Sequence, residues 1–390
     1  MVGWNNMAYE LRLRVYEWVL EAYPRGNLTD YSLVSKEWQE FFEKEIYRHI
    51  TITRPYFRTF HRYLRRQRHL VKHIWLRVEL ERYECDVCDH TILHRASIND
   101  NLELRRSMTG LFSILQSWDD ASDIKLEISI WSLSDMDHTF REDVYIDSDF
   151  NLICELDRPE GPCDETFREM DGENMWRRPY GLGLHPDFDG SLPRVRAVTG
   201  LLVRRHTRCV IGVPTIQQII DKLPKLKEIW YEPRRKYYLI PHNDPYLGYG
   251  DLATLRLPGT LRRVVIFEDF NEAHEKHILS RSLWAQQQPR VRSPSPEVGI
   301  AMAQLSLSLE KLSVSYMTNA SQFFNACRDH WVWHNLRELA LTTNLMRSMT
   351  PETCNLLVRA GQCAMRMPKL HFMELWHGKS KTAAKFVYQS

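Results

Sequence analysis

One group of cysteine and histidine residues has the spacing of a metal site. Cys85 and Cys88 are separated by two residues, and His90 and His94 follow closely. Two thiolates and two imidazoles can hold zinc in tetrahedral geometry. All four lie within a segment too short to wrap easily around an ion, so we expect two ordinary reduced thiols and no tightly bound zinc. The alternative is a site completed after folding by a distant cysteine: Cys154, Cys163 or Cys209.

The segment 54–82 is strongly basic. It contains nine Lys and Arg residues, three His residues and only two acidic residues. Such a segment can contact phosphates or an acidic protein surface. Phe57, Phe60 and Leu64 share one helical face, so the pattern predicts an amphipathic helix with a solvated basic side. We expect an acidic protein surface as its partner in preference to nucleic acid.

No pattern in the chain indicates catalysis. The sequence lacks the Gly-x-Ser-x-Gly elbow, the phosphate-binding loop, the dinucleotide-binding glycine motif and the His-Glu-x-x-His zinc motif. Its acidic and histidine residues are not spaced as acid–base pairs. We therefore expect a protein that is not an enzyme, with no catalytic residue and no cofactor.

Length and composition are those of an ordinary globular protein. The chain has 390 residues, 43% hydrophobic and 26% charged, with a net charge of +2. This is enough for two domains and a large core, and the near balance of charge gives no overall attraction to nucleic acid or membrane. No apolar run suits a transmembrane helix, and the first residues lack a secretory signal. Eight cysteines without that signal favour a cytoplasmic or nuclear location.

Residues 1–52 predict a small helical module. Two sets of apolar residues recur at helical spacing, and Pro24 with Gly26 separates them. The first set is Met7, Leu11, Val15, Trp18, Val19 and Ala22, and the second is Leu33, Val34, Trp38, Phe41, Phe42 and Ile46. Residues 50–53 then alternate and are β-branched, which favours a short strand.

Beyond residue 53 short strand-like segments alternate with helices. The strand-like segments are 71–76, 124–128, 226–231, 261–266, 312–314, 336–341 and 370–375. The helical segments are 107–118, 214–223, 297–309, 320–331 and 351–366. Strand plus helix at roughly 25 to 50 residues is typical of an irregular leucine-rich solenoid, and an ordinary α/β domain is the alternative. We expect one mostly parallel sheet with the helices packed outside it.

Two insertions and the last residues depart from this alternation. Residues 157–194 are rich in Pro and Gly, and residues 286–296 are rich in Gln, Pro, Ser and Arg. Both compositions predict surface loops. Residues 383–390 predict a final strand with no polar capping repeat after it, either because it is the edge of the sheet or because the chain is shorter than its relatives.

The segment 4–52 resembles an F-box. Met7-Ala8-Tyr9-Glu10-Leu11 stands where that family has Leu-Pro, a variable residue, Glu and an apolar residue, with Val15 and Leu20 following. Leu33-Val34-Ser35-Lys36-Glu37-Trp38 matches the family's Val-Ser/Cys-basic-x-Trp run. Residues 4–150 are similar to the F-box-like proteins of filamentous fungi, notably in the strings 31–43, 66–68, 71–80 and Tyr83-x-Cys85-x-x-Cys88. The remainder is similar to their loosely leucine-rich C-terminal regions.

The resemblance implies an α+β or α/β protein with an F-box helical module at 1–52. An irregular leucine-rich-like region at 53–390 would follow, with the loops 157–194 and 286–296 inserted in it. It implies a non-catalytic substrate receptor that binds a Skp-type adaptor, and through it the cullin of a ubiquitin ligase, and that binds a protein target through the array. The residues implied to bind the adaptor are Met7, Leu11, Val15, Leu20, Leu33, Val34 and Trp38.

One residue departs from the family pattern, and two other functions are open. Ala8 replaces the proline that presets the start of the first helix, so we expect the bundle to form with an altered adaptor affinity. One alternative is an F-box-derived interaction scaffold without ligase association. The other is a zinc-dependent nucleic-acid-binding protein that uses Cys85, Cys88 and the basic segment 54–82.

Overall fold

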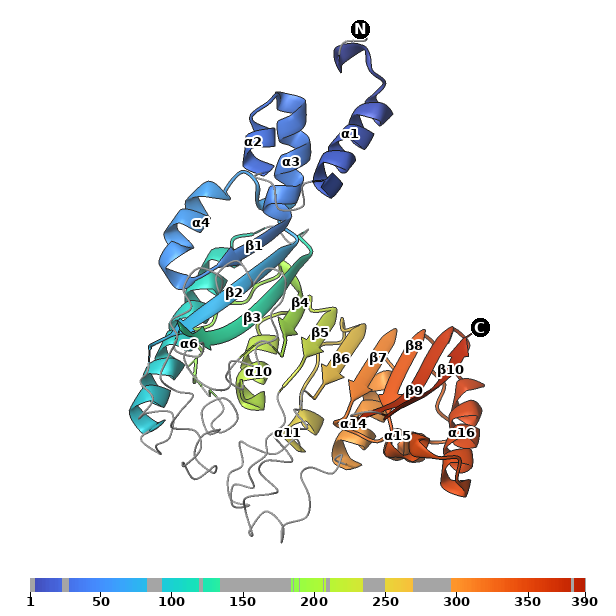
Figure 1. Cartoon of the computed structure of the whole chain (residues 1–390). Coiled ribbons are helices and arrows are strands. Elements are labelled where there is room, and N and C mark those ends of the chain that lie inside the picture. The colour runs from blue at the N-terminus through green and yellow to red at the C-terminus, as the bar shows by residue number, and fades with distance from the viewer. Residues whose placement is uncertain are drawn as a thin grey trace, which may run out of the picture.

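The chain builds one long sheet whose strands follow one another in chain order (Figure 1). The computed structural model describes residues 4–22, 28–82, 93–118, 122–133, 184, 186–188, 190–205, 207, 211–233, 250–268, 296–379 and 382–389. Within these ranges ten strands form a single sheet, and helices precede and flank it. The protein is therefore mixed α/β, as the sequence predicts.

The predicted N-terminal helices are present. They are η1 (Trp4–Asn6), α1 (Tyr9–Ala22), α2 (Leu28–Ser32) and α3 (Lys36–Arg48). The Ser35 hydroxyl accepts a hydrogen bond from the Trp38 backbone N–H at 3.4 Å and so caps α3. The chain passes directly from α3 into β1 (His49–Ile52), which confirms the short strand predicted there.

The nine further strands confirm the expected single, mostly parallel sheet. They are β2 (His73–Leu80), β3 (Ile124–Ser132), β4 (Val198–Val203), β5 (Glu228–Tyr231), β6 (Arg263–Phe267), β7 (Lys311–Ser315), β8 (Glu338–Thr342), β9 (Phe372–Lys379) and β10 (Thr382–Gln389). Neighbours from β1 to β9 pair parallel, and β10 pairs antiparallel with β9 at the edge of the sheet. Strand β4 is not among the strands that the sequence predicts.

The helices after α3 lie between the strands in the chain. They are η2 (Arg54–Tyr56), α4 (Phe57–Tyr63), η3 (Arg68–Leu70), α6 (Leu93–Leu115), α10 (Val213–Ile220), α11 (Gly250–Ala253), α14 (Pro296–Ser306), α15 (Ala320–Ala326), η6 (Asn344–Arg347) and α16 (Pro351–Ala364). Figure 1 shows α10, α14, α15 and α16 on one side of the sheet. None of the helices in the described ranges has both the length and the apolar character needed to cross a membrane.

The ends of the predicted helices 107–118, 214–223 and 297–309 lie three residues beyond those of α6, α10 and α14, and two other boundaries differ by more. Helix α6 begins at Leu93 although the predicted helix begins at residue 107, because Asn99, Asp100 and Asn101 weaken the helical pattern ahead of it. Helix α15 ends at Ala326 although the prediction extends to residue 331, since the next residue, Cys327, has an extended backbone. Of the two predicted loops, the structure describes only residues 184, 186–188 and 190–194 of the first and Pro296 of the second.

One face of the sheet is buried by sets of three apolar residues, and these sets recur with the same spacing from strand to strand. At β8 these residues are Leu336, just before the strand, and Leu339 and Leu341 within it, each fully buried, and the register aligns Leu312 of β7 with Leu339. The equivalent buried sets include Val71/Ile74/Leu76, Leu226/Ile229/Tyr231, Leu261/Val264/Ile266, Leu309/Leu312/Val314 and Leu370/Met373/Leu375. Alternate side chains of a strand point to opposite faces, so the residues between them belong to the other face of the sheet.

A polar cluster joins the turns that follow β7 and β8. The Asn319 carboxamide oxygen accepts from the Ser321 backbone N–H at 3.1 Å and from the Thr343 hydroxyl at 2.9 Å. The Asn319 amide donates to the side-chain oxygen of Asn344 at 2.6 Å. Asn319 and Thr343 are 9% and 2% exposed, so their hydrogen bond fixes one strand–turn unit against the next.

Candidate functional site

Aromatic side chains pack the helices of the N-terminal module together. Tyr16 of α1 is only 1% exposed. Its ring lies 4.8 Å from Phe41 and 5.0 Å from Trp38, measured between centroids, and both partners belong to α3. Trp38 also stacks on Phe42 at 5.4 Å and approaches Trp4 at 5.7 Å. One side of Trp38 is thus part of the module's own core.

An ion pair fixes the start of α1 to the start of α3. The Arg12 guanidinium lies 2.7 Å from a carboxylate oxygen of Glu37, and the Trp4 indole N–H donates to the same oxygen at 3.4 Å. The pair is only partly exposed, so solvent screens it less than a surface pair. Burial, and next the Glu37 carboxylate, raise the pKa of Tyr16 to about 12.

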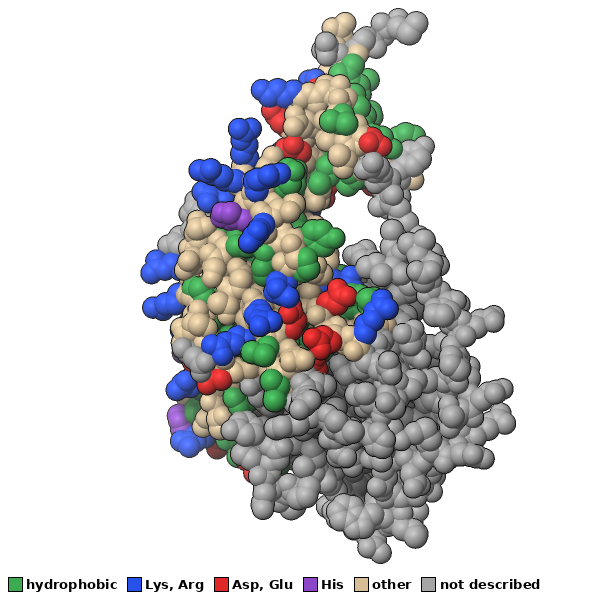
Figure 2. Space-filling view, turned by 90° about the vertical axis from the view of Figure 1, so that its left-hand side faces the viewer, with side chains coloured by type: hydrophobic (Ala, Val, Ile, Leu, Met, Phe, Trp, Pro, Cys, Tyr) green, Lys and Arg blue, Asp and Glu red, His purple; other side chains and the backbone are tan. Residues whose placement is uncertain are grey.

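Apolar side chains remain exposed on the outside of this module. Leu11 is 57% exposed, Leu33 78% and Val34 61%, and all three belong to the residues implied to bind an adaptor. Met7, Val15, Leu20 and Trp38 are partly buried. Figure 2 shows hydrophobic side chains on the surface of the module. Exposed apolar groups on so small a module are typical of a surface that binds a partner.

Two more exposed aromatic residues belong to α1 and were not among the predicted site residues. Tyr9 is 55% exposed and Trp18 is 64% exposed. Leu11, Val15 and Trp18 are spaced i, i+4 and i+7 and therefore share one helix face. That spacing is visible in the sequence, but it does not reveal whether the stripe packs inward or faces solvent.

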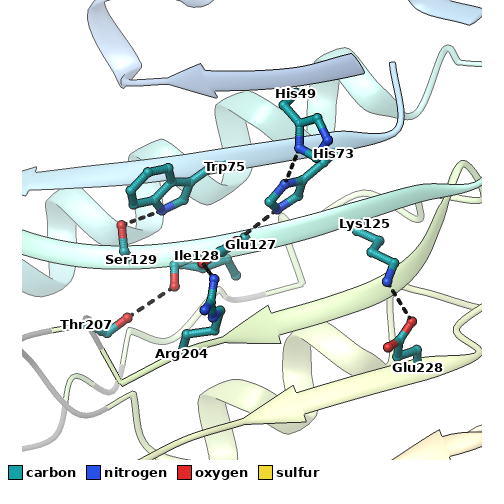
Figure 3. A network of polar contacts seen from close by, with 10 residues as sticks. All are labelled: His49, His73, Trp75, Lys125, Glu127, Ile128, Ser129, Arg204, Thr207 and Glu228. Atoms are coloured by element: carbon teal, nitrogen blue, oxygen red, sulfur yellow. Dashed lines mark hydrogen bonds and ion pairs between the residues drawn. The ribbon is translucent and has the colours of Figure 1, made fainter. Parts of the chain in front are cut away.

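A second candidate site is a polar network on strands β1 to β4 (Figure 3). The register aligns His49 with His73, and their Nδ1 atoms are 3.2 Å apart. The Nε2 atom of His73 lies 2.9 Å from Oε2 of Glu127, and Nη1 of Arg204 lies 3.7 Å from Oε1 of the same carboxylate. Glu127 is only 2% exposed, so the Arg204 guanidinium compensates a buried negative charge, and the His73 ring lies against the same carboxylate.

The same network extends along and beside β3. The Trp75 indole N–H donates to the Ser129 hydroxyl at 2.8 Å, and the Thr207 hydroxyl donates to the Ile128 carbonyl at 3.2 Å. Lys125 forms an ion pair with Glu228 of β5 at 3.1 Å. The Trp75–Ser129 contact joins neighbouring strands, the Lys125–Glu228 pair passes over β4 to join β3 with β5, and the Thr207 contact ties a residue beyond β4 to the β3 backbone. Within the described ranges no group of three His, Cys, Asp or Glu residues is arranged to hold a metal ion.

The remaining predicted residues are only partly covered by the structure. Cys85, Cys88 and His90 lie outside the described residues, as do Cys154, Cys163 and Cys209. His94 falls at the beginning of α6. The amphipathic helix predicted in the basic segment is confirmed by α4, whose Phe57 and Phe60 are buried while Arg58 and Arg62 are exposed.

The C-terminal part of the chain is similar to a known protein family. A model of a family of unknown function (DUF6546) matches residues 256–390, which include β6 to β10. No curated protein matches the chain. The match begins within the sheet, so it covers the last strands of a structure that starts with the N-terminal helices.

Proposed function

We propose that this protein is a non-catalytic substrate receptor of a Skp–cullin–F-box type ubiquitin ligase. Helices α1 to α3 bind a Skp-type adaptor, and the sheet binds a protein target as a leucine-rich-like array. The observation that carries the proposal is the exposure of Leu11, Leu33 and Val34 in the two segments that resemble the F-box motif. These side chains provide an apolar surface that water solvates poorly and that a partner helix can cover.

The connection between module and sheet suits such a receptor. Helix α3 ends at Arg48 and β1 begins at His49, so no linker separates them. Strand β1 pairs with β2, which makes it part of the long sheet. A target on the sheet is then held at a defined position relative to the adaptor. The receptor acts by raising the effective concentration of target lysines near the ubiquitin-loading machinery.

The alanine at the start of α1 is compatible with this proposal. The Ala8 carbonyl accepts hydrogen bonds from the backbone N–H groups of Leu11 and Arg12 at 3.0 and 3.1 Å. Helix α1 therefore begins at this point with alanine in the position of the family's proline. Leu11 is exposed one turn further on, which leaves the apolar contact available.

Co-purification tests the proposal. The tagged full-length chain is expected to capture a Skp-type adaptor and a cullin, and Leu11→Asp with Val34→Asp is expected to lose both, because each change places a charge in an apolar contact. Val358→Asp with Met365→Asp is the matched control, since these residues are 61% and 81% exposed on and just after α16. Capture of adaptor and cullin by a folded Leu11/Val34 double variant would contradict the proposal.

A further inference from the structure

Positive charge is concentrated on α4 and the turn after it. The sequence between Arg54 and Val78 contains no acidic residue. We name the following residues the basic face: Arg58, Arg62, Arg65, Arg66, Arg68 and Lys72, all of them exposed. Figure 2 shows Lys and Arg side chains gathered on the side of the molecule below the N-terminal module. The proposed receptor function gives this face no role.

Three cations of the basic face have no partner among the described residues. Arg58, Arg65 and Arg66 form no ion pair or side-chain hydrogen bond there. Other cations are paired: Arg54 lies 2.6 Å from Glu103, and Lys311 lies 2.6 Å from Glu338. The chain as a whole carries a net charge of only +2, so this concentration of unpaired arginines is local. It attracts an anionic ligand.

Two exposed tyrosine rings lie among these arginines. Tyr56 is 64% exposed and Tyr63 is 62% exposed. The Arg62 guanidinium lies 4.8 Å from the centroid of the Tyr63 ring and donates to its hydroxyl at 2.9 Å. Proteins that bind single-stranded nucleic acid combine basic side chains for the phosphates with exposed rings on which bases stack.

The buried side of α4 argues against a membrane as the ligand. Phe57, Phe60 and Leu64 are at most 9% exposed, and Phe60 stacks on Trp118 at 5.8 Å between centroids. The helix therefore has no free apolar face to insert between lipids. An acidic protein surface, the partner expected from the sequence alone, would use the arginines but gives the exposed tyrosines no base to stack on.

We propose that the basic face, with Tyr56 and Tyr63, binds single-stranded nucleic acid. Arg58, Arg62 and Arg65 contact phosphates, and the two rings stack against bases. The inference is independent of adaptor binding, because it uses residues outside α1 to α3. It requires no metal and no sequence-specific contact.

The test measures binding of a labelled oligothymidine to the full-length chain by fluorescence anisotropy. The oligothymidine is about 20 nucleotides long, which is longer than the ~4–16 nucleotides that one such surface covers. Arg58→Gln with Arg62→Gln and Arg65→Gln is expected to weaken binding at least tenfold. The slope of log K against log salt is negative, and each lost phosphate contact reduces its magnitude by about 0.7. The triple variant should therefore have a slope about 2 smaller in magnitude than that of the wild type. The matched control is Arg263→Gln with Arg337→Gln and Lys369→Gln, which removes the same charge from other exposed positions and should leave affinity unchanged.

A second variant distinguishes the binding of nucleic acid from the binding of other anions. Tyr56→Ser with Tyr63→Ser is expected to weaken oligothymidine binding at least tenfold with little change in salt slope, because the variant keeps every phosphate contact. Unaltered thermal melting would show that each variant is folded. The proposal would be overturned if the chain did not bind oligothymidine at low salt, or if the control variant lost as much affinity as the arginine variant. It would also be overturned if polyglutamate or anionic vesicles displaced the oligothymidine and the tyrosine changes had no effect on its binding.

Discussion

The side chain of Tyr16 packs two helices of the N-terminal module together and also lies close to a charged group. Its ring is buried between α1 and α3, and its hydroxyl lies in the field of the Glu37 carboxylate. Both effects disfavour a phenolate, which raises the pKa from its ordinary value of 10.0 to about 12. The folded module therefore depends on a neutral Tyr16.

Alkaline pH is expected to destabilise this module through Tyr16. Between pH 10 and 12 the unfolded chain loses the tyrosine proton while the folded chain keeps it, so the stabilisation is complete below pH 10 and is lost as the pH passes through about 12. The loss should be on the order of 2 kcal/mol. Urea unfolding followed by tryptophan fluorescence measures it. Tyr16→Phe should flatten the pH dependence, and an identical dependence in wild type and variant would refute the assignment.

Glu127 is the residue on which the polar network of the sheet depends. Glu127→Gln weakens the contacts that the buried carboxylate makes with His73 and Arg204, whose side chains are partly exposed, so we expect it to destabilise the fold by about 1–3 kcal/mol. Glu338→Gln breaks the half-exposed pair with Lys311 and should cost less than about 1 kcal/mol. Denaturant unfolding compares the two. Equal effects would show that the network has no special energetic role.

At the scale of single residues, the sequence predicts some members of the candidate sites and not others. Leu11, Leu33 and Val34 follow from motif and spacing, and the structure shows them exposed. The network of His49, His73 and Glu127 was not predictable, because it depends on the register of neighbouring strands, which the sequence of each strand does not contain. Charged residues at strand positions indicate a solvated face, but they do not reveal which cation meets which carboxylate.

At the scale of elements, the contact between α4 and α6 depends on a glycine. A Cβ atom on Gly110 would lie 2.8 Å from Cε2 of Phe57, closer than carbon atoms approach without movement. Gly110→Ala should therefore destabilise the protein by about 1–3 kcal/mol. Gly361→Ala in α16 is the control, since no atom lies within 4 Å of its added Cβ, and it should stabilise the helix by about 0.5–1 kcal/mol. Urea unfolding of both variants measures this, and the same sign of change in both would contradict the assigned contact.

Strands with one polar face were predictable and a fully buried strand was not. The segment 336–341 alternates apolar residues with Arg337 and Glu338, and it forms β8. Strand β4 is buried at all six positions and contains Gly200, so it lacks both the alternation and the uninterrupted β-branched run that identify a strand. The antiparallel direction of β10 was also hidden, because strand propensity carries no information about direction.

At the scale of the whole molecule, chain order and sheet order coincide. Each strand from β2 to β9 lies between its neighbours in the sequence, which is how stacked repeats build a sheet without long-range rearrangement. The helical module enters this sheet through β1, and the family match at residues 256–390 covers the opposite end. The proposed adaptor surface and the last strands are therefore the two ends of one continuous sheet structure, and the proposed target surface lies between them.

The most direct test of this account is isothermal titration calorimetry of the full-length chain with a purified Skp-type adaptor. We predict a one-to-one complex, at least 100-fold weaker for Leu11→Asp with Val34→Asp, a loss of about 2.8 kcal/mol or more in binding free energy. The control Val358→Asp with Met365→Asp should bind as wild type does, since it adds the same charge to exposed apolar positions at the other end of the chain. No complex with the intact, folded chain, or equal affinity of wild type and the Leu11/Val34 variant, would contradict the central claim.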